Sequence, residues 1–72
     1  MSADTFTIPD EQREAATVLY RSTWALHGPP PMDAVCTGVV FTARAAEGVG
    51  VSREDFLRAC GEEYDRAKQE KP

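Results

Sequence analysis

The residues of this 72-residue chain that could carry nucleophilic or metal chemistry are one histidine and two cysteines, His27, Cys36 and Cys60. No two of them have the close paired spacing of a zinc ligand set. A catalytic thiol needs a helix N-terminus or a neighbouring cation, and both cysteines lie instead among apolar residues that we expect to be buried. We therefore predict neither a metal site nor a Cys–His dyad. A Cys36–Cys60 disulfide is an alternative that a reducing compartment disfavours.

Glycines in the pattern Gly48-x-Gly50 could in principle hold an anion at the start of a helix. The complete dinucleotide-binding pattern and a Gly-Lys-Ser sequence are both absent, so we interpret residues 48–51 as a turn between helices. His27 precedes Gly28 at the end of a predicted helix, where the helix dipole stabilises an imidazolium. Because the sequence offers no acid–base pair, no nucleophile beside a base and no cofactor loop, we predict a protein without enzymatic activity or cofactors.

Net charge limits the classes of partner. The chain has eight Lys and Arg residues against twelve Asp and Glu, for a formal net charge of −4. A phosphate backbone is bound by basic side chains, so nucleic acid is a poor partner, whereas a basic protein surface is well matched. Residues 1–7 are mostly polar, and no apolar run approaches the roughly 18 residues of a membrane span. We expect a cytoplasmic protein with no membrane partner.

The first predicted helix covers residues 8–27. Thr7 is a suitable N-cap with Asp10 three residues later, which resembles a capping box. Gly28, followed by three prolines, is expected to end the helix. The expected core stripe consists of Ala15, Val18, Leu19, Ser22 and Leu26.

The second predicted helix covers residues 32–47 and includes the most apolar stretch of the chain, residues 32–46, with Asp33 and Arg44 as its charged residues. The face expected to join the core consists of Met32, Val35, Cys36, Val39, Ala43 and Ala46, with Val40 beside it. The opposite face consists of Ala34, Gly38, Phe41 and Ala45. A buried strand over residues 36–42 is the alternative, because this segment is rich in β-branched residues and Gly38 costs about 1 kcal/mol of helix propensity. We favour the helix because no second strand is evident for pairing.

The third predicted helix covers residues 52–68. Ser52 followed by Asp55 is a capping signature. The apolar stripe of this helix consists of Phe56, Leu57, Cys60, Tyr64 and Ala67. Its outer face carries Glu54, Arg58, Glu62 and Arg66 at four-residue spacing, at which each ion pair contributes about 0.2–0.5 kcal/mol.

These elements predict an all-α fold, a small three-helix bundle with helices at about residues 8–27, 32–47 and 52–68. We treat residues 1–72 as a single helical domain with frayed ends at residues 1–6 and 69–72. A domain of this size has a stability of about 5 kcal/mol, and leaving Val40 and Phe41 exposed would forgo about 1.5 to 3 kcal/mol each. Because two neighbouring helices can cover only part of the second helix, we predict a homo-oligomer.

Two surfaces are candidates for partner binding. Tyr20 and Trp24 lie one turn apart on the first helix, away from its core stripe, and Phe41 lies on the small-residue face of the second helix. The third helix carries an acidic set, which consists of Glu54, Asp55, Glu62, Glu63 and Asp65. This set could engage a basic protein, or it could be a solvated face paired with the helix's own arginines.

Three functions follow, of which the first is a small protein–protein interaction module that forms a homo-oligomer. The alternative is an acidic inhibitor of the phage type, or a nucleic-acid mimic, that blocks a basic groove on a target protein; the resemblance to such proteins is one of size and charge. The third is a helix-turn-helix DNA-binding protein, because residues 45–59 look like the turn of that motif. A recognition helix needs base-reading side chains near its start, whereas Arg53 is followed at once by Glu54 and Asp55.

Overall fold

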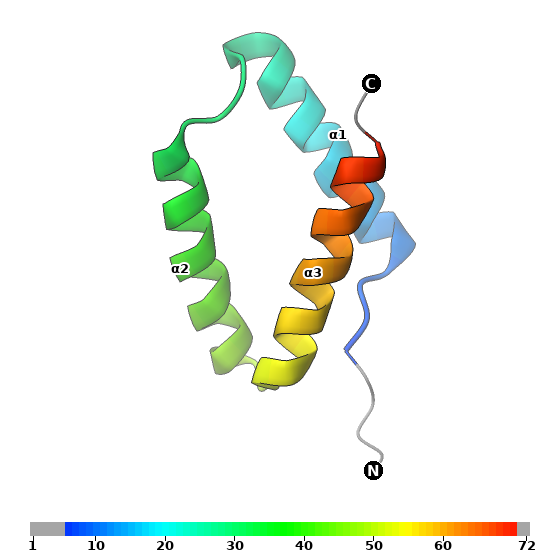
Figure 1. Ribbon diagram of the computed structural model, residues 1–72, viewed down its shortest axis with the longest axis vertical. Coiled ribbons are helices and arrows are strands. Elements are labelled where there is room, and N and C mark those ends of the chain that lie inside the picture. The colour runs from blue at the N-terminus through cyan, green and yellow to red at the C-terminus, as the bar shows by residue number, and fades with distance from the viewer. Residues whose placement is uncertain (1–5, 71–72) are drawn as a thin grey trace. The chain divides into compact units, whose positions relative to one another are not determined.

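The computed structural model describes residues 6–70, and within them the chain forms three helices and no strand. These are α1 (Asp10–His27), α2 (Met32–Gly48) and α3 (Arg53–Gln69), as Figure 1 shows. The predicted all-α class and the three predicted helices are confirmed, and residues 36–42, for which a strand was the alternative, are helical. Of the ends expected to fray, residues 1–5 and 71–72 lie outside the described residues, while Gln69 is helical.

The start of α1 differs from the prediction. Its N-cap is Pro9, in an extended conformation with φ −60° and ψ 144° and without a side-chain capping bond, so the assignment of Thr7 as the cap is wrong. A proline disfavours the helical conformation in the residue before it, and Ile8 therefore stays outside the helix. Asp10, in the first turn, pairs instead with Arg13, whose Nη1 lies 2.8 Å from Asp10 Oδ1.

The predicted end of α1 at Gly28 is confirmed. Gly28 has φ 82°, in the left-handed region that favours glycine, and its N–H donates to the carbonyl oxygen of Trp24 at 2.7 Å. Pro29 and Pro30 follow, and the chain re-enters a helix only at Met32.

The predicted turn after α2 is a Schellman motif centred on Gly50, which has φ 87°. The N–H of Val51 donates to the carbonyl of Ala46 at 2.9 Å, and the N–H of Gly50 donates to the carbonyl of Glu47 at 3.2 Å. Ala46 and Val51, the pair that this motif normally brings into apolar contact, are both half-buried. Local backbone hydrogen bonds therefore define the chain reversal between α2 and α3.

The chain divides into two units. One unit consists of residues 8–42, which include α1, the proline-rich linker and most of α2. The other unit, among the described residues, consists of 6–7 and 43–70, which include the end of α2, the turn and α3. The short segment that precedes α1 in sequence therefore belongs with α3 in space.

The stripes predicted to form the core are largely exposed. None of the residues in α1 or α2 is buried, and in α2 only Ala46 is even half-buried. The prediction that Cys36 and Cys60 are buried is wrong, because both thiols are exposed, and they are free. The physical reason is that a buried core side chain touches about 6–12 other residues, and these exposed side chains are surrounded by fewer.

The buried side of α3 also differs from the predicted stripe. Ala59 is the buried residue, at 6% exposure, although it lies outside that stripe. Within the predicted stripe, Phe56 is half-buried, whereas the other members, Leu57, Cys60, Tyr64 and Ala67, are exposed. Helical periodicity therefore did not identify the buried residue of α3.

Candidate interaction surfaces

The aromatic residues predicted to bind a partner all belong to the unit of residues 8–42. Tyr20 and Trp24, on α1, are 53% and 48% exposed, and Phe41, on α2, is 73% exposed. We call these three residues the aromatic set. Large aromatic side chains supply much of the binding energy at protein interfaces, so their exposure makes this unit a candidate for partner binding.

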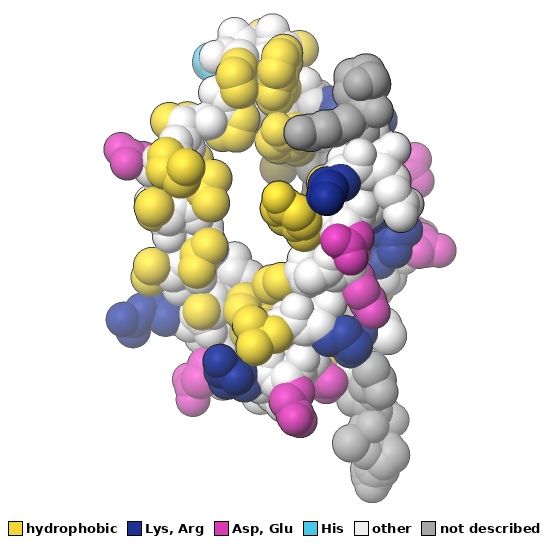
Figure 2. All heavy atoms as spheres, viewed as in Figure 1, with side chains coloured by type: hydrophobic (Ala, Val, Ile, Leu, Met, Phe, Trp, Pro, Cys, Tyr) yellow, Lys and Arg dark blue, Asp and Glu magenta, His cyan; other side chains and the backbone are white. Residues whose placement is uncertain are grey.

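The helix α2 exposes apolar side chains on both of its faces. Val35 and Val39, on the face predicted to join the core, are more than half exposed, and so is Phe41 on the opposite face. Figure 2 shows hydrophobic side chains along the length of α2, interrupted by few charged ones. At Gly38 an added Cβ would have no atom within 4 Å, so the small-residue face is open. A helix that is apolar all round is normally buried, and α2 is instead exposed from residue 32 to residue 45.

The acidic set on α3 is paired in part with arginines of the same helix. Arg58 lies 3.7 Å from Asp55 and 3.4 Å from Glu62, measured from guanidinium nitrogen to carboxylate oxygen. Arg66 lies 3.7 Å from Glu63. The predicted Arg58–Glu62 pair is confirmed, whereas Arg66 pairs three residues back with Glu63. Exposed pairs of this kind contribute about 0–1 kcal/mol each, so their main effect is to offset the negative charge of the helix.

Sequence reasoning missed the contact between Phe6 and α3. Arg58 Nη2 donates to the carbonyl oxygen of Phe6 at 2.6 Å, and the N–H of Phe6 faces Asp55 Oδ2 at 3.5 Å. Phe6, one of the residues expected to fray, thus contacts α3 through both its N–H and its carbonyl oxygen. The available signal was a single aromatic residue in an otherwise mostly polar run, residues 1–7.

The start of α3 orients Asp55 for this contact. Ser52 is the predicted N-cap, and its Oγ accepts from the N–H of Asp55 at 3.1 Å. In a capping box the side chain at the position of Asp55 returns to the main chain of the cap. Here Asp55 Oδ2 instead faces the main chain of Phe6, so one residue connects the helix cap to the segment before α1.

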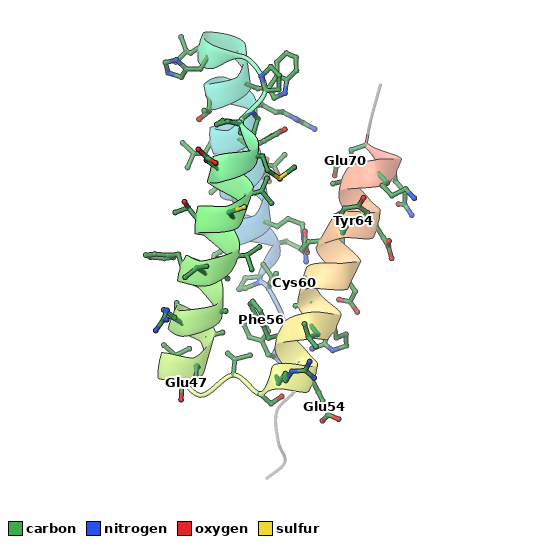
Figure 3. All side chains as sticks on the ribbon, turned by 60° about the vertical axis from the view of Figure 1, so that its left-hand side comes forward. Glu47, Glu54, Phe56, Cys60, Tyr64 and Glu70 are labelled. Atoms are coloured by element: carbon green, nitrogen blue, oxygen red, sulfur yellow. The ribbon has the colours of Figure 1, made fainter. Side chains whose placement is uncertain are left out.

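The apolar side chains of α3 flank this charged region. Figure 3 shows Phe56 and Cys60 on the same side of α3, one turn apart, and Glu54 projecting from its first turn. Tyr64 continues along the helix and is exposed. The helix therefore presents an apolar side beside its paired charges.

Two further features of residues 6–70 concern metal ligands and membrane spans. Residues 6–70 contain no group of three or more His, Cys, Asp or Glu side chains placed to hold a metal ion. None of the described helices has both the length and the apolar character needed to cross a membrane. The chain matches no protein-family model, no curated protein and no solved structure.

Proposed function

We propose that this chain is a small, non-enzymatic interaction protein whose first partner is a second copy of itself, bound through the apolar side chains of α1 and α2. The observation that carries the proposal is the exposure of the unit of residues 8–42. It contains the aromatic set and the apolar faces of α2, yet none of its residues is buried. A predicted binding role for Tyr20, Trp24 and Phe41 is consistent with this exposure.

The energies involved favour association. Covering a Val or Phe side chain that is now exposed yields about 1.5–3 kcal/mol, and a domain of this size has a total stability of about 5 kcal/mol. Covering Val40 and Phe41, which are 55% and 73% exposed, is therefore comparable with the stability of the whole domain. Folding and association of such a chain are coupled, so the apparent stability should depend on protein concentration.

A second copy fits the chemistry of this surface better than a charged partner. In a two-fold dimer the same patch meets itself, which suits an apolar patch and penalises a patch of one charge. From residue 32 to residue 45, α2 carries the opposite charges Asp33 and Arg44 near its two ends and none between them. An antiparallel pair of α2 helices would place the opposite charges near each other.

Sedimentation equilibrium of the full chain tests this proposal. We expect the average mass to rise from monomer toward dimer or higher between low micromolar and millimolar protein, and the thermal midpoint to rise with it. Because the contact is apolar, raising the salt concentration should leave the association intact. A monomeric mass throughout this range would contradict the proposal.

The acidic inhibitor remains the second proposal, and its test is the opposite salt response. The carboxylates of Glu54 and Asp65 would face a basic groove, and binding should weaken steeply as salt rises. The arginine pairs of Asp55, Glu62 and Glu63 reduce the charge available for such a partner. The same pairs, together with the acidic first turn of α3, give least support to a helix-turn-helix DNA-binding role.

A further inference from the structure

We propose that Asp55 and Arg58 form a binding site for polypeptide main chain on α3, and that its occupant is the chain's own residue Phe6. We call residues 6–7 the strap, because they join α3 although they precede α1 in the sequence. The site differs from the self-association surface proposed above, which lies in the other unit.

Two side chains recognise both polar groups of one residue. Arg58 donates from Nη2 to the carbonyl oxygen of Phe6 at 2.6 Å, and Asp55 accepts from the N–H of Phe6 at 3.5 Å. A charged donor and a charged acceptor three residues apart on one helix thus match the donor and acceptor of one extended residue. The Arg58 contact is the stronger of the two, because it is short and charge-assisted.

The neighbouring residues hold the site in place before the strap binds. Asp55 is anchored through its own N–H to Ser52 Oγ at 3.1 Å. Arg58 lies between two carboxylates, with Nη1 3.4 Å from Glu62 and Nη2 3.7 Å from Asp55. The guanidinium group therefore uses one nitrogen for Glu62 and presents the other to Phe6, a division that a lysine ammonium could not reproduce.

The burial of residues on α3 also supports a strap-binding site at Asp55 and Arg58. Ala59 directly follows Arg58 and lies one turn after Asp55, and it is the buried residue of α3. Phe6, Asp55 and Arg58 are half-buried, whereas most of the predicted apolar stripe of α3 is exposed. The two strap-binding side chains therefore lie within one turn of the buried residue of α3.

The strap should be releasable. The side chains of Asp55 and Arg58 remain 32% and 36% exposed, so water and salt compete for the same contacts. Segments held by a few solvent-accessible hydrogen bonds open at low free-energy cost compared with a packed core. Release would expose Asp55 and Arg58, which pair with each other, to solvent.

Limited proteolysis with chymotrypsin tests the site, because Phe6 lies inside the strap and the enzyme cleaves after aromatic residues. The measured quantity is the initial rate of cleavage after Phe6 divided by the rate after Tyr64, which reports opening of α3 itself. We expect Arg58→Gln to raise this ratio by about tenfold, since a hydrogen bond to a charged group is lost. The matched control is Arg66→Gln, which removes the same side chain and one surface ion pair from α3 without touching Phe6.

Two further measurements distinguish release of the strap from unfolding of the Arg58→Gln variant. Raising the salt concentration on the unaltered chain should increase the ratio, because the contacts that hold the strap are charged. Arg58→Lys should give a ratio between those of the unaltered chain and Arg58→Gln. A ratio that is the same for the unaltered chain, Arg58→Gln and Arg66→Gln, and that does not change with salt, would overturn the proposal.

Discussion

The two units of this chain differ in which side chains they leave exposed and which they pair internally. The unit of residues 8–42 exposes the aromatic set and the apolar faces of α2 and buries none of its residues. The other unit holds the arginine–carboxylate pairs of α3, a capped helix, a Schellman turn and the buried Ala59. The first unit has apolar surface left to cover, whereas the second has satisfied much of its polar surface internally.

The interactions that favour association and those that stabilise the single chain therefore lie in different units. Apolar area drives association, because its removal from water is favourable whatever the partner's detailed geometry. Capping bonds and ion pairs depend on direction and are already made within the unit that contains them. We therefore expect changes in residues 8–42 to act on association and changes around α3 to act on the stability of the single chain.

The largest expected effect is that of Phe41→Asn. If a second copy covers Phe41, the change removes about 3 kcal/mol for each buried copy, which weakens association at least 100-fold. Sedimentation equilibrium would measure the shift. The matched control is Val49→Asn, because Val49 is 79% exposed and lies in the turn, outside the unit of residues 8–42. Equal association of both variants would remove Phe41 from the interface.

The next effect is that of Ser52→Ala. Losing the N-cap of α3 should lower the free energy of unfolding by about 1 kcal/mol, and it should also loosen Asp55 at the strap. Thr23→Ala is a suitable control, since Thr23 Oγ1 donates to the carbonyl of Leu19 within an exposed helix and caps nothing. Chemical denaturation would compare the two variants at a concentration where the chain is monomeric. If Thr23→Ala lowers the free energy of unfolding as much as Ser52→Ala does, the capping bond of Ser52 contributes no more than an ordinary side-chain hydrogen bond.

The smallest effects are expected from alanine substitutions of two glycines inside helices, Gly38 in α2 and Gly61 in α3. Neither would meet another atom within 4 Å if a Cβ were added. Gly61→Ala should therefore raise the free energy of unfolding by up to about 1 kcal/mol. Gly38→Ala should gain as much in the monomer but weaken association, because a Cβ there would hold a second α2 further away. If association is unchanged in Gly38→Ala, the contact lies on the Val35/Val39 face instead.

Much of the local structure could be predicted because its causes lie within a few residues. Gly28 ends α1, Gly50 reverses the chain and Ser52 caps α3, each through hydrogen bonds to residues three to five positions away. The error at Thr7 was also local, because the effect of Pro9 on Ile8 outweighed the capping signature.

The sequence by itself determined the three helices, the end of α1 at Gly28, the turn after α2, the cap of α3 and the concentration of apolar residues in α2. Only the tertiary structure decided that Phe6 joins α3, 49 and 52 residues away, and that Ala59 rather than the Phe56–Tyr64 stripe is buried there. Periodicity shows which residues share a side of a helix. Which side is covered depends on the segment that packs against it, and this choice is made by contacts between residues that are distant in the sequence.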